Sequence, residues 1–157
     1  MNTITATARE WLERGRAATS PIDAVTDYWR GFNNLYAAAR YRVDERTRIR
    51  TYLARTVSSQ DAQEILAVDG QAIAYLLSQP VIDMRGTGLN TLPAMEAFAA
   101  STDSKEKLAE LFMIIYQVRC NLEHGDKSPT LERDVDLCRA SAPFVAAVVK
   151  RCTEERS

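Results

Sequence analysis

The chain alternates between segments with helical spacing of apolar residues and short polar breaks. In the clearest segment, residues 20–40, apolar and aromatic side chains recur at intervals of three and four, which places them on one face of an α-helix. That face consists of Val25, Tyr28, Trp29, Phe32, Leu35 and Tyr36. Ser20 and Pro21 are favoured at the N-cap and in the first turn of a helix. We therefore predict a helix whose aromatic face packs in the core.

Further helices are predicted along most of the chain. They cover residues 3–18, 44–57, 61–79, 94–101, 104–123 and 128–152. Gly70 interrupts residues 61–79, so this segment forms one helix or two. Pro143 should bend or break the last helix, because a proline inside a helix lacks the backbone N–H and clashes with the preceding turn. The predicted fold class is all-α: an up-and-down helical bundle with additional helices.

Residues 80–93, PVIDMRGTGLNTLP, contain two prolines and two glycines and form the best loop candidate. The chain has 157 residues, of which 46% are hydrophobic, values typical of one folded domain with its own core. We therefore interpret residues 1–157 as a single helical domain, with the loop as an excursion within it.

The helix predicted for residues 104–123 is apolar on two sides. One arc consists of Leu108, Leu111, Phe112, Ile115, Val118 and Leu122, and a second stripe consists of Met113, Tyr116, Cys120 and His124. Such a helix lies deep in a bundle or in a subunit interface. We therefore predict a homodimer whose interface includes Met113, Tyr116 and Cys120. Gly125 is expected to end the helix in a left-handed conformation.

Arg119 falls within the apolar arc of this helix. A buried guanidinium is costly unless it is paired or solvated, so Arg119 either pairs with Glu123 and extends to solvent or is kept there for function. His124, the only histidine of the chain, either stabilises the helix C-terminus or acts in catalysis. The two residues lie about 140° apart on a regular helix. They converge only if the helix ends between them or a partner chain joins the site.

The net charge of −1 gives no global signal for nucleic acid binding. The three cysteines, Cys120, Cys138 and Cys152, form no CxxC motif, which favours free thiols in a reducing compartment. The single histidine disfavours a zinc site. The N-terminal segment lacks the apolar stretch of a signal peptide, and no window approaches the ~20 apolar residues of a membrane span. We expect a soluble, cytoplasmic protein without a metal or other cofactor.

Two segments resemble those of a known family. RCNLEHG, residues 119–125, resembles the Arg-x4-6-His signature of the HEPN family, and DYWRGFNNLYAAARY, residues 27–41, is similar to the Trp-x2-Phe-Asn-x-Leu-Tyr helix of many bacterial members. The resemblance covers these two helices, in the expected order. It implies an all-α bundle and, as in many members, a metal-independent endoribonuclease that cuts RNA in a dimer cleft, as a toxin or in phage defence. It assigns Arg119 and His124 to catalysis and Asn121 to their support.

The motif departs from the family pattern at two positions. Cys120 stands where a polar residue such as asparagine is common, and Glu123 where an aromatic residue is common. A carboxylate beside the site repels phosphate and can pair with Arg119, so both residues are expected to tune the site. One alternative is therefore a catalytically silent HEPN module that binds RNA or a protein partner such as an antitoxin. Another is a plain helical dimerisation domain.

The residue types suit RNA cleavage by the strand's own 2′-hydroxyl. Histidine exchanges protons near neutral pH, and a guanidinium can hold the charged phosphate through two hydrogen bonds. One histidine cannot easily serve as both acid and base. A two-fold dimer supplies two histidines and two arginines, which fits a composite site.

An arginine-rich segment is the candidate for holding the RNA. Six arginines lie between residues 40 and 55, and Arg42, Arg46 and Arg50 are spaced at i, i+4 and i+8, a single stripe if helical. Tyr41 and Tyr52 lie nearby and can stack on bases. The other interpretation is a solvated helix face with acidic partners elsewhere in the fold.

Overall fold

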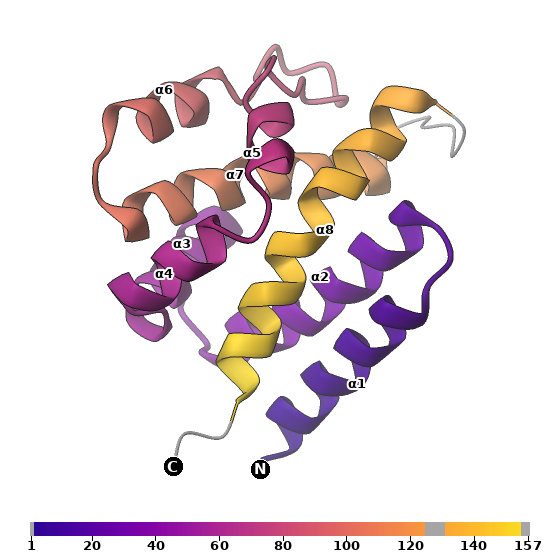
Figure 1. Ribbon diagram of the computed structural model, residues 1–157, viewed down its shortest axis with the longest axis vertical. Helices are drawn as coiled ribbons and strands as arrows, with labels where there is room; N and C mark the ends of the chain where they lie inside the picture. Colours follow the sequence, from indigo (N-terminus) through magenta and orange to yellow (C-terminus); the bar gives the residue numbers. More distant parts are fainter. Residues whose placement is uncertain (1, 125–130, 155–157) are drawn as a thin grey trace.

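The computed structural model describes residues 2–124 and 131–154, which form eight helices and, apart from one isolated bridge between Ile82 and Asn90, no strand pairing (Figure 1). The helices are α1 (Thr3–Ala17), α2 (Pro21–Ala38), α3 (Glu45–Thr56), α4 (Ser59–Leu66), α5 (Gly70–Leu76), α6 (Leu92–Ala100), α7 (Ser104–His124) and α8 (Glu132–Thr153). The predicted all-α helical bundle is confirmed.

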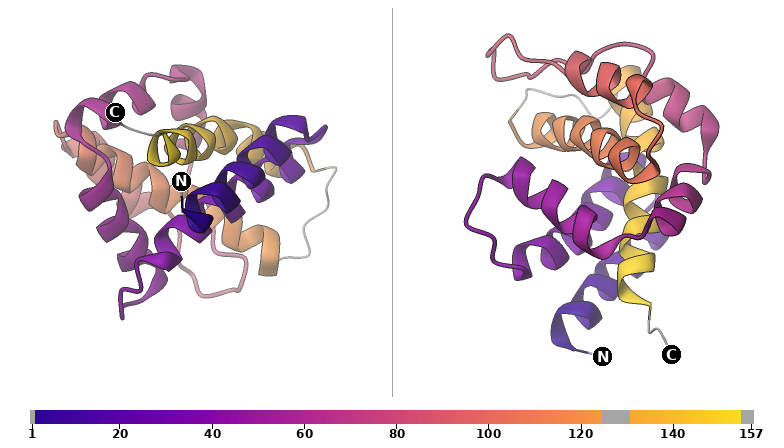
Figure 2. Two further views of the ribbon diagram at one scale, coloured as in Figure 1. Left: turned by 90° about the horizontal axis from the view of Figure 1, so that it is seen from below. Right: turned by 90° about the vertical axis from the view of Figure 1, so that its left-hand side faces the viewer.

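The bundle has two parts that meet along α7. Helices α1, α2 and α8 pack against one another, and α7 runs across them (Figure 1). Helices α3, α4 and α6 pack on α7 from other directions, as the turned views in Figure 2 show. Consequently α7 is covered on several sides, and Arg119 and Asn121 of the predicted motif lie where α2, α3 and the loop before α6 approach it.

Helix α2 forms as its sequence predicts. The Ser20 side chain accepts a hydrogen bond from the backbone N–H of Asp23 at 3.1 Å, and Pro21 occupies the first turn. Phe32 is fully buried, and its ring centroid lies 5.2 Å from those of both Trp29 and Phe112. The rings meet edge to face, an arrangement that aromatic quadrupoles favour. The aromatic stripe is therefore core, with only Tyr28 half-buried.

The second apolar stripe of α7 is covered within the chain. Met113 and Cys120 are buried. Tyr116 is half-buried and contacts Trp29 of α2 and Arg46 of α3. The two apolar faces thus place α7 deep in the bundle, one of the two outcomes expected for such a helix. Of this stripe, Tyr116 in part and His124 at the helix end remain accessible, and the predicted interface stays a prediction. Gly125, the predicted helix end, lies outside the described residues.

The predicted breaks have mixed outcomes. The segment around Gly70 forms two helices, because Asp69 caps α5 by accepting a hydrogen bond from the N–H of Ala72 at 3.0 Å. Helix α8, by contrast, continues through Pro143 without a break. The last helix was predicted to begin at residue 128, which lies outside the described residues, and α8 begins at Glu132.

Candidate functional site

Arg119 lies on the side of α7 that faces α2 and α3. Its guanidinium carbon is 6.0 Å from the centroid of the Trp29 ring, within reach of a cation–π contact. Nη2 forms an ion pair with Oε1 of Glu123 at 2.6 Å, and Nη1 lies 4.0 Å from Oε1 of Glu45. The side chain keeps 24% of its surface exposed. The expected pairing with Glu123 and access to solvent are therefore both present.

Glu45, at the first position of α3, is held by two tyrosines. The hydroxyl of Tyr36 donates to Oε1 at 2.6 Å, and the hydroxyl of Tyr116 donates to Oε2 at 3.0 Å. Burial and then Glu45 raise the pKa of Tyr36, and burial, Cys120 and Glu45 raise the pKa of Tyr116. Both phenols therefore stay protonated at neutral pH and keep donating. The result is a carboxylate fixed beside Arg119.

Sequence reasoning missed the role of Glu45. Its position in the first turn of a helix explains an acidic residue without any function. The usable signal was the pair of tyrosines at core positions, because a buried phenol needs a hydrogen-bond partner. Nothing in the spacing of Tyr36 and Tyr116 identifies Glu45 as that shared partner.

Cys120 lies in the α7 turn between Tyr116 and His124 and is buried. Burial raises the pKa of its thiol, whereas Tyr116 and Arg119 act in the opposite direction. At neutral pH the thiol is therefore protonated and neutral, unlike the reactive thiolate of a nucleophilic cysteine. Cys120 contributes a small uncharged group to the surroundings of Arg119.

Asn121 is buried and fixes the loop before α6 onto α7. Its Nδ2 donates to the carbonyl of Ile82 at 2.8 Å, and its Oδ1 accepts from the N–H of Met84 at 3.1 Å and from Nε2 of Gln117 at 2.9 Å. An amide with both donor and acceptor used in this way holds two chain segments in register. The predicted support of catalysis by Asn121 would therefore act through the loop.

This loop brings a further arginine to the site. Arg85 donates to the buried carboxylate of Asp83 through Nε at 3.1 Å and Nη2 at 2.8 Å, and Thr87 donates to the same carboxylate at 2.9 Å. Asp83 is the main cause of the raised pKa of Arg85, and Cys120 and Tyr116 add to it. Arg85 thus belongs to the turn that Asn121 attaches to α7. Sequence reasoning missed Arg85, since the loop gave no sign of folding back.

His124 is exposed at the last position of α7. The helix is unbroken from Arg119 to His124, so the two side chains project from different faces of one helix. The first route to convergence, a helix end between them, is therefore not observed. Within one copy of the described chain, α7 does not aim both residues at one point, and the remaining route is a partner chain.

The predicted arginine stripe is reduced to two residues. Arg42 precedes α3 because Asp44 caps that helix, accepting from the N–H of Thr47 at 2.9 Å. Arg46 donates to Oε1 of Gln117 at 3.2 Å and lies over the Tyr116 ring, whereas Arg50 is paired with Glu110. For Arg50 the expectation of an acidic partner elsewhere in the fold is met.

The two tyrosines proposed for base stacking are not equally accessible. Tyr52 is buried with 7% of its surface exposed, so it offers no ring face to a base. Tyr41 is half-buried, and the guanidinium of Arg55 covers its ring at 5.0 Å. Stacking on bases would therefore need other groups.

The part of the chain that the structure describes shows neither a cluster of metal ligands nor a membrane-spanning helix. In residues 2–124 and 131–154, no three side chains of histidine, cysteine, aspartate or glutamate are gathered as for a metal ion. No helix in these ranges has the length and apolar character to cross a membrane.

Comparison of the chain with protein-family models, curated protein sequences and solved structures finds no match. The residues around α7 are therefore the basis for inferring function.

Proposed function

We propose that the chain is a metal-independent endoribonuclease of HEPN type that cuts single-stranded RNA as a homodimer, as a toxin or in phage defence. One observation carries this proposal: Arg119 is held, partly exposed, by a fixed shell of Trp29 and Glu45, and the exposed His124 lies at the end of the same helix. A guanidinium at an apolar helix position costs free energy that an apolar side chain would not. The position of this cation on the same helix as the sole histidine supports chemistry on a phosphate.

The proposed reaction uses the RNA's own hydroxyl. One His124 removes the proton from a 2′-hydroxyl, whose oxygen attacks the adjacent phosphorus and forms a new P–O bond. The bond from phosphorus to the 5′-oxygen breaks, and a second His124 gives that oxygen a proton. Arg119 stabilises the charge that gathers on the phosphate oxygens. The products are a 2′,3′-cyclic phosphate and a 5′-hydroxyl end.

The reaction requires two copies of the chain. Each copy supplies one histidine, and general acid and general base are both needed. The separation of Arg119 and His124 on the faces of α7 leads to the same requirement. A two-fold axis near the end of α7 would bring the residues of both copies together.

The test is RNA cleavage by the purified chain and its Arg119→Ala, His124→Ala and doubly substituted variants. Both single variants should lose activity by at least about a hundredfold, and the double variant should lose little more, because residues that act as a unit are not additive. Wild-type activity should survive EDTA, and products should carry cyclic phosphate. Cleavage by His124→Ala at the wild-type rate, or products with a 3′-hydroxyl, would contradict the proposal.

A second candidate function follows from the carboxylates around Arg119. Glu123 is within 2.6 Å and Glu45 within 4.0 Å of the guanidinium, so the positive charge is already compensated. This favours a catalytically silent module that binds RNA or a protein partner such as an antitoxin. Binding of RNA without any cleavage, in the wild type and in Glu123→Gln alike, would select this function.

A further inference from the structure

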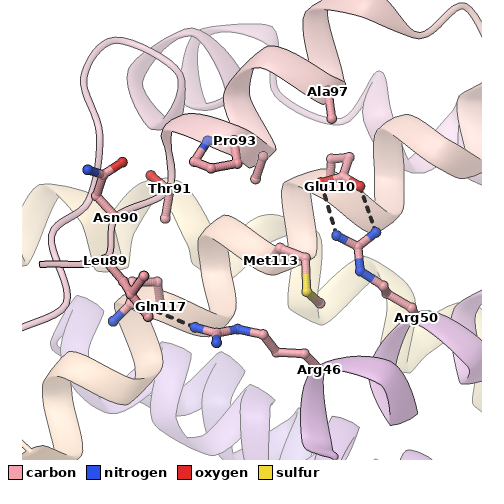
Figure 3. A pocket seen from close by; sticks show the side chains of 11 residues that line it. Arg46, Arg50, Leu89, Asn90, Thr91, Pro93, Ala97, Glu110, Met113 and Gln117 are labelled. Atoms are coloured by element: carbon pink, nitrogen blue, oxygen red, sulfur yellow. Dashed lines mark hydrogen bonds and ion pairs between the residues drawn. The ribbon is translucent and has the colours of Figure 1, made fainter. Parts of the chain in front are cut away.

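A groove of about 400 Å³ lies between α3, α6 and α7 (Figure 3). Arg46 and Arg50 line it from α3, and Glu110 and Met113 line it from α7. Leu89 lines it from the loop before α6, and Pro93 from the first turn of α6. The volume is at the lower end of the range for small-molecule sites. The groove is thus large enough for a single small ligand and is lined by two arginines.

The two arginines differ in whether a carboxylate neutralises their charge. Arg50 donates to both carboxylate oxygens of Glu110, at 2.6 and 3.1 Å, so its charge is neutralised. Arg46 bonds only the neutral amide of Gln117, at 3.2 Å, and forms no ion pair with any other described residue. Figure 3 shows these two pairs at opposite ends of the groove. Arg46 is therefore the cation ready to receive an anion.

The rest of the groove is apolar with amide groups at its edge. Leu89, Pro93 and Ala97 form one wall, and Met113 lies between the two guanidinium groups (Figure 3). Flat apolar rings pack well on such side chains. The amide of Gln117 is buried and already bonded to Arg46 and Asn121. The exposed Asn90 also lines the groove, and an amide of this kind forms hydrogen bonds with the edges of bases.

We infer that this groove binds one nucleotide unit, with its phosphate at Arg46 and its base against Leu89, Pro93 and Met113. The unit belongs to a free nucleotide or to an RNA strand. Arg46 also lies over Tyr116, which bonds to Glu45 beside Arg119. The groove therefore borders the surroundings of Arg119, and the RNA arm of the inference rests on the proposed function.

The experiment measures binding of AMP, UMP and a 2′-O-methylated oligonucleotide that cannot be cleaved. Arg46→Gln should weaken binding about tenfold, as expected for loss of a charged hydrogen bond, and should reduce the salt slope by about 0.7 for the oligonucleotide. Ala97→Phe should block the groove. The matched controls are Arg55→Gln on α3 and Ala99→Phe on α6, both exposed positions that do not line the groove.

Glu110→Gln is a second test, whose expected result cannot be produced by misfolding. It frees Arg50 and removes a negative charge, so binding should become several-fold tighter, a gain that an unfolded chain cannot give. Equal effects of Arg46→Gln and Arg55→Gln, or no effect of Ala97→Phe in a folded variant, would overturn the inference. Binding of mononucleotides as tight as that of the oligonucleotide supports the free-nucleotide arm, and much tighter oligonucleotide binding supports the strand arm.

The binding and cleavage experiments can contradict the groove and the ribonuclease independently of each other. Binding in the groove without cleavage of natural RNA leaves this inference intact and contradicts the proposed ribonuclease. Cleavage that is unchanged in Ala97→Phe and Arg46→Gln contradicts the groove as a substrate site and leaves the ribonuclease intact.

Discussion

Arg119 lies between two carboxylates that are held very differently. Glu45, on α3, receives hydrogen bonds from two phenols, one on α2 and one on α7. Glu123 is 48% exposed, and its described contact is the ion pair with Arg119. Exposed ion pairs of this kind contribute little to stability. Glu123 can therefore release Arg119 at low cost, whereas Glu45 is part of the structure that holds the arginine in place.

Replacing Glu123 by glutamine should raise RNA affinity or cleavage by about two- to fivefold, in line with the modest strength of an exposed ion pair. The substitution keeps the shape of the side chain and removes the negative charge that repels phosphate. Glu10→Gln, at an exposed position of α1, is the control for a general change in charge. Steady-state cleavage and binding of an uncleavable oligonucleotide measure the effect. A fall in activity would show instead that Glu123 orients the site.

Among the elements around the Arg119–His124 segment, the loop before α6 is the one that Asn121 bonds directly. Asn121 bonds Ile82 and Met84, and Asp83 bonds Arg85 and Thr87, so a single amide on α7 positions a turn that carries a cation. Arg85 pairs with Asp83, and this partner holds the pKa of the Asp83 carboxyl well below its usual range. The turn therefore keeps its internal bonds across the neutral pH range, and its attachment to α7 depends on Asn121.

Asn121→Ala should destabilise the protein by about 1–3 kcal/mol, because it leaves the buried amide of Gln117 and two partly buried backbone groups of the loop without a partner. Hydrogen exchange at the N–H of Met84 should become faster, and RNA affinity should fall as Arg85 loses its position. Asn121→Asp provides the comparison, since it keeps the acceptor for Met84 and loses the donor to Ile82. Unchanged exchange at Met84 in Asn121→Ala would show that the loop is held by other contacts.

Phe32→Ala tests the core that supports the site. Phe32 is fully buried against Trp29 and Phe112, so its loss should cost about 3–5 kcal/mol of unfolding free energy. Phe98→Ala on α6, at a half-buried position, should cost clearly less. Chemical denaturation measures both. Equal losses would mean that α2 does not dominate the core.

The sequence predicted helices and their buried faces well because periodicity reports which side of a helix is apolar. The stripe of α2 and the arc of α7 are examples. The pattern did not reveal what covers the second stripe of α7. Residues 80–93 have no periodicity, and only the contact of Asn121 with Ile82 and Met84 shows that they fold back. Contacts between distant segments, such as Glu45 with Tyr116, leave no local signal.

At the scale of the whole molecule, the argument for a homodimer no longer rests on an apolar face of α7. Of the Met113, Tyr116 and Cys120 stripe that suggested a dimer interface, Met113 and Cys120 are buried within one chain, and Tyr116 is half-buried. The argument that remains is chemical and geometric. One chain provides one histidine, and α7 directs Arg119 and His124 to different sides. Homodimerisation is therefore still a prediction, now tied to activity rather than to an apolar face.

Mixing wild-type chains with His124→Ala chains tests this dependence. If one site needs both histidines, mixed dimers are inactive, and an equal amount of the variant should reduce activity per wild-type chain to about half after exchange of subunits. A tenfold excess should reduce it to about a tenth. The same excess of an unrelated helical protein is the control. Activity per wild-type chain that stays constant at every ratio would show that each chain cuts RNA alone, with a single histidine serving as both base and acid.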